Sequence, residues 1–149
     1  MRTLLRAEEG WVPQRDSIHE AVRNALIRDG WTITADPFSM RYEELRVMAD
    51  LAAEKSLLAE RGTESIVVEI KTFGGRSFVR ELEMALGQYF LYERILKRLQ
   101  LPHKLYLATS QIAYDAFLVA DGARAMLHDG MVSLIVVNLE QERVTQWID

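Results

Sequence analysis

Apolar residues along this chain recur at helical spacing in two segments and at strand spacing elsewhere. The first helical segment carries its apolar stripe at Ile18, Val22, Ala25 and Leu26. Ser17 and Glu20 stand three apart at its beginning, a capping-box pattern that satisfies the free N–H groups of a first turn. Gly30 supplies a left-handed end. We therefore expect a first helix between Ser17 and Gly30.

The second helical segment is longer and has strand patterns on both sides. Its core positions predict a helix over 78–100, ended by Pro102: Leu82, Leu86, Tyr89 and Leu96. The β-branched residues of 65–71 are typical of a central strand, which Gly74 and Gly75 end. The other expected elements are strands over 31–35, 45–51 with a continuation and turn over 52–61, and 105–109; a helix over 110–118; a helical or irregular stretch over 121–130; and a terminal hairpin of 131–138 and 143–148, turned by 140–142.

This order of elements predicts an α/β (α+β) fold with a mixed central β-sheet flanked by helices. A chain of 149 residues fits one domain of ordinary size, and no Pro-, Gly- or Ser-rich linker divides it. We expect a single domain over 15–149, preceded by an irregular N-terminal arm over 1–14.

Composition narrows the function classes. The chain has no cysteine, which excludes disulfide scaffolds, thiol catalysis and cysteine-ligated zinc. No apolar run approaches the roughly 20 residues of a membrane helix. The first residues include Glu8 and Glu9 and lack the apolar centre of a signal peptide. These features predict a cytoplasmic protein.

One constellation could carry chemistry. Glu69 and Lys71 lie two apart on the predicted central strand, so their side chains point to the same side of the sheet. If the strand that ends near Asp50 is its neighbour, the two carboxylates converge. With the backbone carbonyl of Ile70 they form an all-oxygen site suited to Mg²⁺ or Mn²⁺. The alternative is a surface salt bridge between Lys71 and either carboxylate.

Several longer stretches make the chain resemble the XisH family, the fdxN element excision controlling factor proteins. The stretches are Arg15-Asp16 with His19-Glu20-Ala21-Val22; Asp29-Gly30-Trp31-Thr32-Ile33-Thr34 with Asp36-Pro37; Asp50-Leu51 with Ala53-Glu54-Lys55; Val68-Glu69-Ile70-Lys71; Ala85-Leu86-Gly87-Gln88-Tyr89 with Leu91-Tyr92; and Gln146-Trp147-Ile148. The resemblance runs from Arg15 to the C-terminus.

The resemblance implies the restriction-endonuclease-like fold of the PD-(D/E)XK superfamily and a cyanobacterial source. It assigns Asp50 and Glu69 as metal-binding carboxylates and Lys71 as the lysine of the motif. Two positions depart from the pattern: Ala49 precedes Asp50 in place of the proline, and Ala52 stands where a glycine is expected. The residues over 1–14 also extend beyond the usual start of the family.

Further candidates come from the neighbouring helices. The resemblance implies an acidic residue of the first helix near the site, and Glu20 is the match. The alternative role of Glu20, which has at least equal weight, is to close the capping box with Ser17. His19 is the other residue of that helix that could face the sheet. Gln88 on the long helix is expected to reach towards the site. Glu54 is interpreted as a solvated turn carboxylate rather than a second support for the metal.

The resemblance leaves three functions open. The first is a Mg²⁺- or Mn²⁺-dependent endonuclease, or the nuclease-like subunit of an excision machine. The second is a non-catalytic regulator or adaptor of a site-specific recombinase, acting through a protein partner. The third, and weakest, is an enzyme on RNA or another phosphodiester.

Charge bears on the partners. The chain has 18 Lys plus Arg against 22 Asp plus Glu and a net charge of −4, which disfavours stand-alone binding to DNA. We expect the isolated chain to bind duplex DNA poorly at physiological salt, and productive binding to need a second subunit, either another copy in a homo-oligomer or the companion protein XisI that the resemblance implies. The terminal hairpin offers a docking edge beside Trp147, unless Trp147 caps the core.

Overall fold

The computed structural model describes residues 15–57, 62–127 and 131–149. One mixed sheet is built, in this order across its width, from β1 (Thr32–Ala35), β4 (Leu51–Leu57), β5 (Gly62–Ile70), β6 (Lys104–Ser110), β7 (Leu134–Asn138) and β8 (Arg143–Ile148). Strands β5, β6 and β7 are parallel, and the outer pairs are antiparallel. The expected α+β architecture with a mixed central sheet is confirmed.

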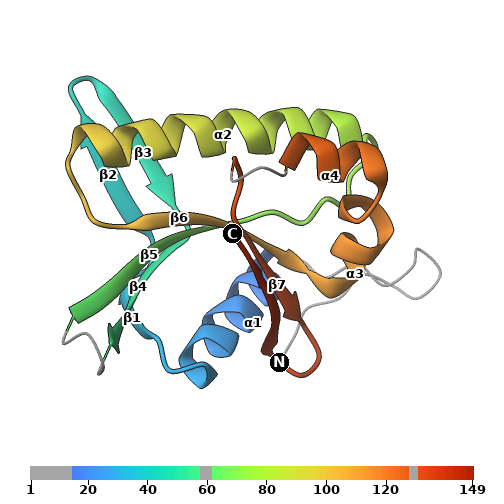
Figure 1. The fold of residues 1–149 in the computed structure, drawn as a ribbon, viewed down its shortest axis with the longest axis horizontal. Helices are drawn as coiled ribbons and strands as arrows, with labels where there is room; N and C mark the ends of the chain where they lie inside the picture. The colour runs from blue at the N-terminus through green and yellow to red at the C-terminus, as the bar shows by residue number, and fades with distance from the viewer. Residues whose placement is uncertain (1–14, 58–61, 128–130) are drawn as a thin grey trace.

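Helices cover both faces of this sheet (Figure 1). Helix α1 (Arg15–Arg28) packs on one face and the long helix α2 (Phe78–Arg98) on the other. The short α3 (Gln111–Ala113), a π-helical turn η2 (Tyr114–Leu118) and α4 (Asp121–Leu127) complete the α2 side. None of the helices in the described ranges is long and apolar enough to cross a membrane.

The alternation of β5 divides the core in two. Ile66, Val68 and Ile70 are buried in the cluster that contains the apolar stripe of α1. Val67, between them, is buried in the cluster that contains Tyr89 and other residues of α2. Because neighbouring side chains of a strand point to opposite faces, Glu69 belongs to the α2 face. The face on which the candidate site lies is therefore fixed by the apolar residues around it.

The first helix has the expected stripe and end, but a different beginning. Its described part starts at Arg15, so Ser17 lies inside the first turn and the expected capping box is wrong. Ser17 is buried rather than at the exposed boundary of a helix. Gly30 has a φ of 93°, and the N–H of Trp31 donates to the carbonyl oxygen of Leu26, as the left-handed end predicts.

The segment between β1 and β5 differs most from the expectation. It contains an unpredicted hairpin of β2 (Phe38–Tyr42) and β3 (Leu45–Ala49), which forms a separate two-stranded sheet (Figure 1). The predicted strand over 45–51 is divided at Asp50, and β4, not β3, pairs with β5. The expectation that 45–51 and 66–70 are neighbours is therefore wrong for most of its length. The turn expected in 52–61 includes residues 58–61, which lie outside the described residues.

The C-terminal half follows the prediction closely. Helix α2, strand β6 and the antiparallel hairpin of β7 and β8 are all present, although β7 begins at Leu134 rather than at 131. The predicted core positions Leu82 and Leu86 are only half-buried, while Ala85 between them is buried. Trp147 packs against the rings of Trp31 and Tyr106, with centroids 5.6 and 5.1 Å apart, so it caps the core.

Candidate metal centre

Asp50 occupies the bend between β3 and β4. Leu51, the next residue, is paired with Val68 on β5. This register brings the Asp50 carboxylate to the end of β5, where its Oδ2 accepts a hydrogen bond of 2.7 Å from the backbone N–H of Ile70. The interaction fixes the first predicted ligand directly beside the second, even though the two strands carrying the carboxylates run in opposite directions.

Glu69 is the buried member of the site, with 5% of its surface exposed. Its Oε2 lies 3.3 Å from the Nζ of Lys71, the ion pair that alternation on a strand predicts. Its Oε1 is buried and has no hydrogen-bond partner among the described residues. A buried carboxylate oxygen without a partner is costly, and it is available to a cation.

The two carboxyl groups interact with each other. The pKa of Glu69 is raised from its usual 4.5 to about 7, first by burial and second by the charge of Asp50, against the lowering effect of Lys71. Repulsion between the two carboxylates acts in the same direction as burial, and burial is the larger cause. A bound cation would stabilise the charged form of both groups and release this proton.

Thr109 is a neighbour of the site that the sequence pattern did not reveal. Ile70 is level with Ala108 on β6, so Lys71 is level with Thr109, and the backbone N–H of Lys71 donates to the carbonyl oxygen of Ala108 at 2.9 Å. Thr109 is 1% exposed, and its hydroxyl has no partner among the described residues. The available signal was a hydroxyl side chain that follows a run of buried residues, Leu105 to Ala108, near the end of β6.

Within the described part of the chain, the other candidate residues have different neighbours or lie apart from these side chains. Gln88 is half-buried on α2, and its amide oxygen is buried without a partner in the described part of the chain. Glu20 is exposed on α1, which covers the face opposite Glu69. His19 pairs instead with Asp36, at 2.8 Å. Glu54 is exposed, as expected, but it lies within strand β4 and not in a turn.

The donor set fits a hard divalent cation. Asp50, Glu69 and the carbonyl of Ile70 provide oxygen only, which Mg²⁺ and Mn²⁺ prefer over softer ligands. No group of three or more His, Cys, Asp or Glu side chains that could hold a metal occurs in the described ranges. Mg²⁺ commonly binds through one or two carboxylates and retains several waters, so a site of this kind does not need a third. The unpartnered Oε1 of Glu69 is the observation that supports the fit.

Comparisons with known proteins identify one matching family and two similar solved structures. The XisH family (XisH protein) matches residues 12–145. The crystal structure of an XisH family protein from Nostoc punctiforme is 36% identical, covers 90% of this chain and 100% of its own, and superimposes with a TM-score of 0.80. The crystal structure of an FdxN element excision controlling factor protein from Anabaena variabilis is 34% identical, covers 91% and 100%, and has a TM-score of 0.81.

Both structural relatives come from cyanobacteria. A search among curated proteins finds no match. The family match spans nearly the whole chain, and two solved structures agree with it in both sequence and fold. The chain therefore belongs to the XisH family.

Proposed function

We propose that this protein is a nuclease-like factor that controls the excision of a DNA element and hydrolyses a phosphodiester at a divalent-metal site. The observation that carries the proposal is the convergence of Asp50, Glu69 and Lys71 at the end of β5. A structural relative is named as a controlling factor of fdxN element excision, which supplies the biological context. The proposal includes the restriction-endonuclease-like classification and action on DNA in the cytoplasm.

Each residue has a distinct role in this mechanism. The carboxylates of Asp50 and Glu69 and the carbonyl of Ile70 would hold Mg²⁺ or Mn²⁺. The bound metal would polarise the phosphodiester and lower the pKa of a water molecule. Lys71, beside Glu69, orients that water or offsets the negative charge that grows on the phosphoryl oxygens. Gln88, whose amide oxygen is buried and unpartnered in the described ranges, is proposed to support the arrangement from α2.

A second candidate function is a non-catalytic regulator or adaptor of a site-specific recombinase. The net charge of −4 favours it, because DNA approaching the site meets carboxylates rather than a broad basic surface. In both cases we propose that tight DNA binding at physiological salt needs a second subunit, either another copy of this chain or the companion XisI. Because Trp147 caps the core, the proposed docking place is the backbone edge of β8, the last strand of the described sheet, and does not involve the Trp147 ring.

Plasmid cleavage decides between the two functions. Supercoiled plasmid is incubated with the purified protein and Mg²⁺ or Mn²⁺, with and without the companion. We expect nicked or linear product from the wild type, none from Glu69→Ala, and wild-type activity from Glu54→Ala. The control removes one carboxylate of the same type from an exposed position on β4. Equal cleavage by Glu69→Ala and wild type, or no metal-dependent cleavage under any condition, would leave the regulator as the better description.

A further inference from the structure

The hairpin of β2 and β3 has two different faces. Its inner face is apolar and packs against the α2 side of the core: Phe38, Met40, Tyr42 and Val47. The hydroxyl of Tyr92 on α2 also donates to the carbonyl oxygen of Met48 at 3.2 Å. The hairpin is thus attached to the body by one face and by a hydrogen bond to its second strand.

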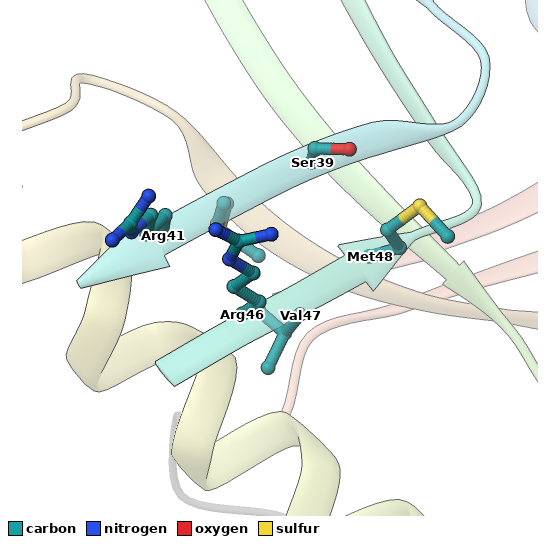
Figure 2. A pocket seen from close by; sticks show the side chains of 6 residues that line it. Ser39, Arg41, Arg46, Val47 and Met48 are labelled. Atoms are coloured by element: carbon teal, nitrogen blue, oxygen red, sulfur yellow. The ribbon is translucent and has the colours of Figure 1, made fainter. Parts of the chain in front are cut away.

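The outer face combines two arginines with one apolar side chain. Arg41 and Arg46 are directly opposite each other across the two strands, as are Ser39 and Met48. All four are exposed, Met48 to 60%. They line an open hollow of about 640 Å³, and Figure 2 shows both guanidinium groups on the hairpin with Ser39 and Met48. In the described ranges, neither arginine forms an ion pair with a carboxylate, and Arg41 donates only to the backbone oxygen of Glu43.

The second strand of the hairpin leads directly along the chain into the candidate metal centre. Strand β3 ends at Ala49, and Asp50 follows it. A strand rises about 3.3 Å per residue, so Arg46 lies at most about 13 Å along the chain from Asp50. Glu43 and Glu44 occupy the turn at the opposite end of the hairpin. The arginines therefore lie along the chain between the acidic tip of the hairpin and the carboxylates of the candidate site.

We propose that the outer face of the β2–β3 hairpin binds the phosphate backbone of duplex DNA and guides it to Asp50 and Glu69. The inference rests on the proposed function and identifies the surface through which the substrate is held. Arginine suits this role because its planar fork of donors matches the oxygens of a phosphate. An opposed pair on a two-stranded ribbon offers two such forks side by side. Met48 adds an apolar contact for a sugar or base edge.

The test measures how duplex binding depends on salt. Fluorescence anisotropy of a labelled duplex is followed in metal-free buffer between about 25 and about 150 mM salt, where phosphate contacts dominate affinity. Each phosphate contact contributes about 0.9 to the slope of log K against log salt, so Arg41→Gln/Arg46→Gln should make the slope shallower by about 1.8. Arg41→Lys/Arg46→Lys keeps the charges and should keep most of the slope.

The matched control removes the same charge from another exposed surface. Arg94→Gln/Arg98→Gln on α2 should leave the slope as in the wild type. An unchanged slope in the hairpin variant, an equal loss in the control, or no duplex binding by the wild type at the lowest salt would overturn the inference. If the double variant does not fold, the single variants Arg41→Gln and Arg46→Gln should each lose about 0.9 of the slope.

Plasmid cleavage by the same preparations keeps this inference separate from the proposed function. If the double arginine variant has a shallower salt slope but the wild type shows no metal-dependent cleavage, the hairpin contact is supported and the nuclease function is excluded. If the wild type shows metal-dependent cleavage but the double arginine variant keeps the wild-type salt slope, the nuclease function is supported and the hairpin contact is excluded. Binding and hydrolysis are read independently because the anisotropy buffer contains no metal.

Discussion

Replacing Glu69 by glutamine is expected to change how the stability of this protein depends on pH. Burial, together with the charge of Asp50, raises the pKa of Glu69 from 4.5 to about 7 in the folded chain. Between these values the folded state keeps a proton that the unfolded chain has lost. The resulting stabilisation is fully present below about pH 4.5 and is lost as the pH rises through about 7. Glutamine carries no such proton, so the variant lacks this dependence.

The size of the effect follows from the two pKa values. One pKa unit corresponds to about 1.36 kcal/mol, and only part of the interval is crossed in an accessible experiment. Between about pH 5 and about pH 8, Glu69 lowers the free energy of unfolding by about 2 kcal/mol. For a chain of this size each kcal/mol corresponds to about 2–4 °C in the melting temperature. The wild type should therefore lose roughly 4–8 °C relative to Glu69→Gln over this range.

Urea unfolding followed by circular dichroism, in metal-free buffer at several pH values, measures this difference. Glu54→Gln is the control, because Glu54 is exposed on β4 and its variant should follow the wild type at every pH. Divalent metal added at high pH should raise the free energy of unfolding of the wild type. The same metal should leave the free energy of unfolding of Glu69→Gln unchanged. A difference between wild type and Glu69→Gln that stays constant from about pH 5 to about pH 8 would refute the reasoning.

Three further predictions follow from the same geometry. Calorimetry with Mn²⁺ should give millimolar or tighter binding by the wild type, weaker below about pH 7 where Glu69 holds a proton, and equal heats from Asp50→Ala would contradict it. Tyr89→Phe should lower the free energy of unfolding by about 1–3 kcal/mol in a urea titration, because the carbonyl of Leu105 and the N–H of Ser133 lose their partner; a cost near zero would show that water replaces the hydroxyl. In gel shifts at physiological salt the isolated chain should bind duplex weakly and more tightly with its companion, whereas tight, salt-resistant binding by a verified monomer would show that the charge argument is wrong.

Local patterns in the sequence predicted the central elements and the common face of Glu69 and Lys71 on β5. Strand β5 is a run of β-branched residues, so its position and the common face of Glu69 and Lys71 followed directly from the alternation of a strand. The long helix was predicted from its apolar spacing, and the left-handed end at Gly30 from residue type alone. These features depend on contacts close in sequence, or on a burial pattern that is strong by itself.

The hairpin shows where the prediction stopped. The segment Phe38–Tyr42 alternates apolar and polar residues, and its burial alternates in the same way, so a strand signal was present. It was missed because the strand follows Pro37 closely and pairs with β3 rather than with the main sheet. Pairing partners are not encoded in the pattern of one strand. For the same reason the division of the predicted strand at Asp50 became visible only in the fold.

Contributions from distant segments were the hardest to predict. The level position of Thr109 beside Lys71 depends on the parallel register of β5 and β6, which more than thirty residues of loop and helix separate in sequence. Glu20 illustrates the opposite case. The resemblance directed it towards the site, but α1 packs on the other face of the sheet and leaves it exposed. A residue's place on a helix wheel cannot say which face of the sheet that helix will cover.

The register of β4 and β5 connects the stability of the core with the geometry of the site. Leu51 is opposite Val68, and both are buried in the cluster beneath α1. A slip of one residue would turn the apolar side chains of β5 towards α2 and would bury both Glu69 and Lys71 in the apolar cluster under α1. The same slip would remove the N–H of Ile70 from the carboxylate of Asp50. The burial of the apolar residues therefore selects the one register in which the two carboxylates meet. The same apolar packing, which the fold requires in any case, offsets the unfavourable free energy of burying Glu69.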